Sequence, residues 1–249
     1  MTSLDHPIPE RLKKEPLIEA LWEIRFSNDK ESVVELLPGL IYKVIGAAYP
    51  KIQRLPAGNL PPAILHQDAN LRYVPTTRLI GDRYSIQIGE HVVSLSCPRP
   101  YTGWEKFQVK IRELAQVLKE TDLLTGPERF CLKYVDVIPV SDTPSIEPLE
   151  VILKLGTHEL SDRPVQLRTE IREDKFLHIV QIVSPAQVTL PTGGKFEGVL
   201  VDIDTICQHE SGDFWLNFNE LLGQAHGLGK KLFFRLLKAN TIKRLDPEY

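Results

Sequence analysis

The feature that most constrains the fold is an alternation of apolar and more polar side chains in residues 17–26, LIEALWEIRF. Successive side chains of a strand point to opposite faces of a sheet, so the alternation predicts a strand with one buried and one wetter face. The predicted buried face is made of Ile18, Ala20, Trp22, Ile24 and Phe26. The charged side chains Glu19, Glu23 and Arg25 fall on the other face. A sheet built on this strand therefore needs a covering layer on one side only.

Periodic segments follow this strand in an order that occurs twice. The first half predicts a helix at 33–48, a loop at 50–63, short strands at 70–79, 83–89 and 91–97, and a helix at 103–120. The second half predicts strands at 129–138, 164–173, 175–183 and 197–207, and helices at 146–156, from near Phe214, and at 229–244. Equivalent elements are offset by about 110 residues, which indicates an internal duplication.

The repeated order predicts an α+β fold. Each half is expected to be a β-α-β(3-4)-α unit, in which an antiparallel sheet carries its helices on one face, similar to TATA-binding-protein-like or helix-grip folds. Residues 1–15 are interpreted as an N-terminal arm, residues 16–124 as the first half and residues 125–249 as the second. The two halves are expected to form one continuous two-lobed domain.

Composition narrows the class of protein. The chain has 249 residues, of which 42% are hydrophobic and 25% charged, as in ordinary globular proteins. Its formal net charge of -3 argues against a general polyanion binder. No apolar run approaches the roughly 18 residues that cross a bilayer, and no signal-peptide pattern is present. The three cysteines lack metal-site spacing, so a cytoplasmic protein with reduced thiols and no cofactor is expected.

Five stretches together resemble a known family. They are residues 16–26 (PLIEALWEIRF), 88–107 (IGEHVVSLSCPRPYTGWEKF), 129–140 (RFCLKYVDVIPV), 200–206 (LVDIDTI) and 225–234 (AHGLGKKLFF). They are similar to a sporadically distributed prokaryotic family of chains close to this length. The most specific piece is Tyr101, Gly103 and Trp104, followed by Phe107.

The resemblance implies a role but no reaction. The family's scattered distribution is typical of genes in mobile or defence islands, which implies a regulatory or partner-binding role. The sequence departs from the family in one place. Where the family tends to have Arg-Tyr followed by Asn, this chain has Lys133, Tyr134 and Asp136.

Two aspartates suggest a metal site. Asp202 and Asp204 are two residues apart on a predicted strand, so both point to one face, and paired carboxylates can hold Mg²⁺ or Mn²⁺. Glu170 would join them if the strands at 164–173 and 197–207 were neighbours. The alternative interpretation is the polar outer face of a sheet.

The stretch 229–244 is basic and amphipathic. Its cations include Lys230, Lys231, Arg235 and Lys238, and it contains no acid. Such a helix can contact phosphates, an acidic partner or a membrane surface, or it can dock on its own sheet. His226, which precedes it among glycines, is interpreted as a cap or interface residue.

The wetter face of the predicted sheet is the last candidate surface. Its charged residues are Glu19, Glu23, Arg25, Arg168, Glu170, Arg172, Asp202 and Asp204. A face with charges of both signs suits a protein of complementary charge better than a phosphate backbone, and its alternative is an ordinary solvated face.

These observations favour a non-enzymatic interaction or regulatory protein that binds a protein partner or a second copy of itself. The alternatives are a metal-dependent hydrolase or nuclease using Asp202 and Asp204, and a nucleic-acid binder using the basic stretch.

Overall fold

The computed structural model describes residues 7–27, 33–61, 64–65, 68–124, 126–141, 144–190, 193–208 and 213–249. The chain is α+β, built mostly of antiparallel strands with a few helices. It divides into two compact units, which we describe separately. Unit 1 comprises residues 1–18, 133–205 and 224–249, and unit 2 comprises residues 19–132 and 206–223. No helix in the described ranges is both long and apolar enough to span a membrane.

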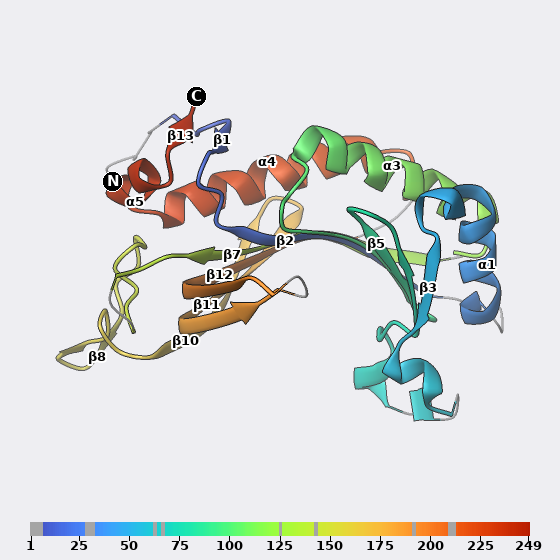
Figure 1. Cartoon of the computed structure of the whole chain (residues 1–249), viewed down its shortest axis with the longest axis horizontal. Coiled ribbons are helices and arrows are strands. Elements are labelled where there is room, and N and C mark those ends of the chain that lie inside the picture. The colour runs from blue at the N-terminus through green and yellow to red at the C-terminus, as the bar shows by residue number, and fades with distance from the viewer. Residues whose placement is uncertain are drawn as a thin grey trace. The chain divides into compact units, whose positions relative to one another are not determined.

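Unit 1 is an antiparallel layer covered by a helix. Its strands follow the order β10 (Val165–Glu173), β11 (Phe176–Thr189), β12 (Lys195–Gln208) and β7 (Gly126–Ile138). Helix α4 (Phe218–Leu236) lies along one face of β7 and β12, and the short helix α5 (Ala239–Arg244) follows it (Figure 1). The hairpin of β8 (Lys154–Leu155) and β9 (His158–Glu159) precedes β10.

The core of unit 1 lies between these strands and α4. Val180 and Ile182 of β11 and Val201 and Ile203 of β12 are buried in one cluster, against which Phe233 of α4 packs. Each buried side chain of this size contributes about 1.5–3 kcal/mol to stability. Because strand side chains alternate, the residues between them point to the face away from α4.

Helix α4 approaches β12 closely at Gly229. A Cβ atom at this position would lie 2.9 Å from the hydroxyl oxygen of Thr205. That hydroxyl is hydrogen-bonded to Nδ1 of the buried His178 on β11, at 3.0 Å. A glycine is therefore needed here because the helix touches a side chain that is already engaged.

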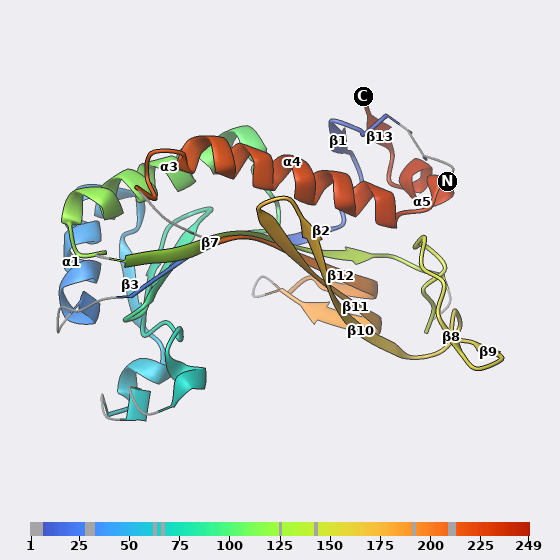
Figure 2. The same ribbon diagram turned by 180° about the vertical axis from the view of Figure 1, so that it is seen from behind.

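Unit 2 has its own antiparallel layer and its own helices. Its strands follow the order β2 (Leu17–Ser27), β6 (Val92–Pro98), β5 (Ser85–Ile88), β4 (Thr77–Ile80) and β3 (Lys51–Arg54). Helix α3 (Trp104–Thr121) runs along one face of these strands, and α1 (Val33–Ile45) packs against α3 (Figure 2). Short 3-10 helices occupy Gly46–Ala48, Pro56–Asn59 and Ala69–Leu71.

The predicted buried face of the first strand is confirmed. Trp22, Ile24 and Phe26 are fully buried, whereas the residues between them are only partly buried. Phe218, in the first turn of α4, and Phe130, at the start of β7, both belong to unit 2. The ring of Phe218 packs edge-on against Trp22 at a centroid distance of 5.9 Å and against Phe130 at 5.4 Å. The helix predicted at 103–120 is confirmed as α3, and it buries Phe107, Ile111, Leu114 and Leu118 as its periodicity indicates.

A short ladder joins the two ends of unit 1. Strand β1 (Arg11–Leu12) pairs antiparallel with β13 (Pro247–Glu248), and Arg11 forms an ion pair with Glu248. The segment interpreted as an arm is thus hydrogen-bonded to the C-terminal residues.

Several predicted elements are wrong. The helix predicted at 146–156 is absent, because its backbone is bonded elsewhere: the amide of Ile146 donates to Ser161 and that of Glu150 to Leu236. The loop predicted at 50–63 contains strand β3, whose four side chains are all exposed and include a single apolar residue, Ile52. The strand predicted at 70–79 is ordered as β4 only from Thr77, and the helix predicted from near Phe214 begins at Phe218.

A glycine-to-alanine pair tests the packing of α4. Gly229→Ala should destabilise unit 1 by about 1–3 kcal/mol, since its Cβ would meet Thr205. Gly227→Ala, on the same helix with open space around it, should stabilise the helix by up to about 1 kcal/mol. Urea unfolding curves give both values. Equal effects of the two variants would show that α4 does not touch β12 at Gly229.

Candidate functional site

Unit 1 presents a strand face that carries charge. The register of β10 and β11 places Arg168 opposite Gln181, Glu170 opposite Ile179 and Arg172 opposite Leu177. These residues alternate with the buried ones, so they point away from α4. The amide of Gln181 donates to Asp202 of β12 at 3.3 Å, which places Asp202 on the same face. We call this surface the charged face; it consists of Lys133, Arg168, Glu170, Arg172, Gln181, Asp202 and Asp204.

The charged face has a tightly paired part and an exposed part. The ammonium of Lys133 lies 2.8 Å from a carboxylate oxygen of Asp202, whose side chain is 11% exposed. On β10, Arg168 and Glu170 form an ion pair of 3.1 Å, with side chains that are 54% and 48% exposed. Exposed pairs contribute little to stability. Because the side chains of Arg168 and Glu170 are exposed, their charges are accessible to a partner, whereas the carboxylate of Asp202 is held within the unit by Lys133.

The structure does not bring Glu170 to the aspartate pair. Strand β11 lies between β10 and β12, so Glu170 is two strands from Asp202, which corresponds to about 10 Å at ordinary strand spacing. Within the described ranges, no group of three His, Cys, Asp or Glu side chains could hold a metal ion.

The other charged residues of the predicted face belong to unit 2. There, Arg25 donates to Glu23 at 2.7 Å, and Arg129 lies 3.7 Å from the same carboxylate. The hydroxyl of Ser96 donates to Glu19. The guanidinium of Arg25 also lies 4.3 Å from the centre of the Tyr73 ring. These side chains form a local network within unit 2.

The basic stretch 229–244 is not a single helix. Helix α4 ends at Leu236, and Lys238 is extended and precedes α5. The break occurs where the amide of Lys238 donates to the carbonyl of Pro148 and where the buried Leu237 bridges Leu149. The cations are therefore divided between two helices, with Lys230, Lys231 and Arg235 on the first and Lys238 at the start of the second. Lys230 donates to the carbonyl of Glu10 at 2.9 Å.

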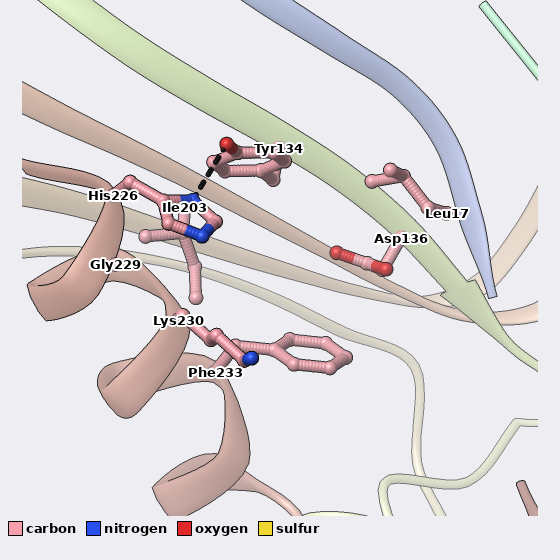
Figure 3. Close-up of a pocket in the computed structure, with 8 residues that line it drawn as sticks. All are labelled: Leu17, Tyr134, Asp136, Ile203, His226, Gly229, Lys230 and Phe233. Carbon is pink, nitrogen blue, oxygen red and sulfur yellow. Dashed lines mark hydrogen bonds between the residues drawn. The ribbon is translucent and has the colours of Figure 1, made fainter. Parts of the chain in front are cut away.

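A pocket of about 100 Å³ lies between α4 and the strands of unit 1 (Figure 3). Figure 3 shows Tyr134 and Asp136 entering it from β7, and His226 and Lys230 from α4. Apolar walls come from Leu17, Ile203 and Phe233, with Gly229 between them. The phenol oxygen of Tyr134 and Nδ1 of His226 are hydrogen-bonded at 3.0 Å. We call this cavity the polar pocket.

Burial shifts the pKa values of the titratable side chains in the polar pocket in the direction that favours their uncharged forms. It raises the pKa of Asp136 well above its usual value, and the carboxylates of Glu15 and Asp202 raise it further. It lowers the pKa of His226 to about 4, assisted by the positive charge of Lys230. It also lowers the pKa of Lys230, against the opposing effect of Glu10. Burial therefore favours the protonated form of Asp136 and the neutral form of His226.

Sequence reasoning missed the polar pocket. The sequence marks Tyr134 and Asp136 only through a family pattern, from which Asp136 departs, and it predicts His226 as a cap or interface residue. His226 lies inside α4 and is hydrogen-bonded to Tyr134 of β7, so it is an interface residue and not a cap. One signal was present: tyrosine and aspartate two apart share a strand face, and histidine and lysine four apart share a helix face. What the sequence does not provide is that these two faces meet.

The family-like residues near Tyr101 lie in unit 2. They border an open groove of about 660 Å³, whose walls include Arg83, Tyr84, Lys106 and Lys110. Phe107 stacks under Tyr84, and the hydroxyls of Tyr84 and Thr102 are 2.7 Å apart. These aromatic contacts account for the motif as packing at the start of α3.

Comparison with known proteins yields no match to a family model and none among curated proteins.

Replacing Asp136 tests the polar pocket. The folded-state pKa of Asp136 is raised above its unfolded value of 3.8, so its favourable contribution is complete below pH 3.8 and is lost as the pH rises toward the folded pKa. Asp136→Asn cannot ionise, so its melting temperature should exceed that of the wild type at pH 8, by a margin that shrinks toward pH 4. Asp202→Asn is a comparison variant rather than an independent control: it should lower stability by about 1–3 kcal/mol, because it breaks the pair with Lys133, and it should also lower the pKa of Asp136. A constant loss of stability in Asp136→Asn at every pH would contradict the assignment.

Replacing His226 tests whether the protonation of this histidine destabilises the folded protein. Its pKa is lowered from 6.5 to about 4, so its stabilising effect is complete above pH 6.5 and is lost as the pH falls toward 4. The shift corresponds to a loss of up to about 3 kcal/mol. In His226→Gln, the free energy of unfolding should change less between pH 6.5 and 4 than in the wild type. Urea titrations across this range measure it, with His158→Gln on the exposed β9 as the control that should keep the wild-type profile.

Proposed function

We propose that this protein is a non-enzymatic interaction module that binds a protein partner on the charged face of unit 1. The observation that carries the proposal is the exposed arginine–glutamate–arginine row of β10, at Arg168, Glu170 and Arg172. A regular strand holds these charges at fixed spacing, so a partner surface that presents acid, base and acid in the same order would be complementary.

The arrangement of charge supports a protein partner over a nucleic acid. Acidic side chains lie among the cations of the charged face, and a phosphate backbone would be repelled by them. The basic stretch is split between α4 and α5, and one of its cations, Lys230, lies at the polar pocket. This division weakens the case for binding nucleic acid along a continuous basic stripe.

Ion pairing supports a binding role over metal-dependent hydrolysis. Asp202 is engaged by Lys133 and Gln181, which compete with any cation for its carboxylate. Glu170 lies on a strand that does not adjoin β12. No observation favours catalysis at Asp202 and Asp204 over their role in the face.

We also propose that the chain arose by duplication of a TATA-binding-protein-like or helix-grip-like unit, in a prokaryotic regulatory system. Element order supports this: the long strand β2 is followed by four antiparallel strands, β3 to β6, and the long helix α3, and the long strand β7 is followed by the three main antiparallel strands β10 to β12 and the long helix α4. The first half has α1 after its long strand, and the second has the β8–β9 hairpin in the corresponding place.

Charge reversal on β10 tests the binding role. Tagged wild-type protein should recover a partner from its native host, and Arg172→Glu should reduce the recovery by about tenfold or more. Lys154→Glu, a reversal on β8, is the matched control and should recover the partner as the wild type does. Equal recovery by both variants, or an eluate dominated by absorbance at 260 nm, would contradict binding of a protein at the charged face.

A further inference from the structure

The outer edge of β10 is open within unit 1. In the described residues β10 pairs with β11 alone and ends the strand order. Figures 1 and 2 show it as the outermost strand of this layer. Its nine residues pair with β11 without a bulge, and none is a proline or glycine. A long, regular edge exposes a row of backbone donors and acceptors that a further strand can use.

The side chains of β10 restrict which strand can pair with that edge. An arbitrary strand would meet the exposed charges of Arg168 and Glu170, which within the described ranges are paired only with each other, and such charges normally discourage edge pairing. The sequence VQLRTEIRE, however, is complementary to itself when reversed about Thr169. In that antiparallel register Arg168 lies opposite Glu170 of the second copy, and Glu170 opposite its Arg168. We infer that β10 pairs with β10 of a second copy of this chain, in the register centred on Thr169.

Apolar side chains support the same register. Leu167 lies opposite Ile182 on β11, so it and Ile171, four residues on, face the α4 side. Ile171 is 38% exposed, because no strand beyond β10 covers it. The Thr169 register brings Leu167 of each copy against Ile171 of the other, where both become covered.

Other symmetric registers that keep the two α4 layers on the same side are less favourable. Centring on Glu170 places this carboxylate against itself and Arg168 against Arg172 of the other copy. Centring on Arg168 places two guanidinium groups together. Centring on Ile171 does pair Glu170 with Arg172, but it aligns only residues 169–173. The Thr169 register alone aligns the whole strand, and it pairs Arg168 with Glu170, while Arg172 lies opposite Gln166 and Glu173 opposite Val165.

This inference concerns the backbone edge of β10, although the side chains of Arg168 and Glu170 also belong to the face proposed for the partner. Its consequence for the assembly is that the charged faces of the two copies become one surface. A twofold axis normal to the sheet keeps both faces on the same side.

A charge swap tests the register on the purified full chain. Analytical ultracentrifugation should show a dimer whose dissociation constant rises by about tenfold or more in Arg168→Glu and in Glu170→Arg. The double variant R168E/E170R restores opposite charges in the Thr169 register, so its dissociation constant should return to within about threefold of the wild type. In the Ile171 register the same double variant would face like charges and stay dissociated. A monomeric wild type at about 100 μM, or single variants that dimerise normally, would overturn the inference.

Cysteine crosslinking provides an independent measurement. Thr169→Cys places two cysteines opposite each other across the twofold axis, so mild oxidation should give a covalent dimer. Ile171→Cys is the control and should remain uncrosslinked, because its counterparts are separated by four residues along the strands. The native cysteines Cys97, Cys131 and Cys207 are buried, which keeps the background low. Preferential crosslinking of Ile171→Cys would overturn the Thr169 register. Since both measurements use the purified chain alone, a monomer that still captures a partner would leave the proposed function standing.

Discussion

The close packing of α4 against β12 determines how unit 1 distributes its polar groups. At Gly229 the helix backbone approaches Thr205, whose hydroxyl is already held by His178. With the helix this close, the α4 side of the strands is shielded from water along the core. Ionisable side chains on that side must then be neutral or hydrogen-bonded, and those on the other side are free to carry charge. The polar pocket and the charged face are the two outcomes of this one contact.

The polar pocket shows how the interior accommodates four polar side chains. The hydroxyl of Tyr134 and the ring of His226 satisfy each other, so neither needs a charge. Asp136 is buried deeply enough to favour its protonated form, and Asp202, which acts on it electrostatically, is itself balanced by Lys133. The two sides of the layer are electrostatically coupled, because the negative charge of Asp202 raises the pKa of Asp136.

The sequence predicts strands and helices best where apolar residues recur with the period of the element, every second residue in a strand and every three to four residues in a helix. The alternation around Trp22 and the helical spacing of Phe107 and Ile111 are set by local geometry, and both are found as expected. The segment after Ile146 misleads because its apolar residues mimic a helix, while its backbone bonds are made with Ser161 and Leu236. Strand β3 has the opposite problem: its side chains are all exposed, and one apolar residue, Ile52, is too little to predict its pairing with β4.

For the candidate surfaces too, some features are predictable from the sequence and others are not. That Arg168, Glu170 and Arg172 share a face follows from their spacing, and the register with β11 agrees. The position of Glu170 relative to Asp202 depends on strand order, which spacing does not encode. The meeting of His226 with Tyr134 is likewise a long-range contact between a helix and a strand.

The β1–β13 ladder has a mechanical consequence. The strands run antiparallel, with Arg11 opposite Glu248, so the outward ends of the two segments leave from the same side of the ladder. Tension applied between the two ends of the chain would open these bonds one after another, as in a zipper, rather than all at once in shear. The ladder can thus yield at low force and release slack before the load reaches the core under α4.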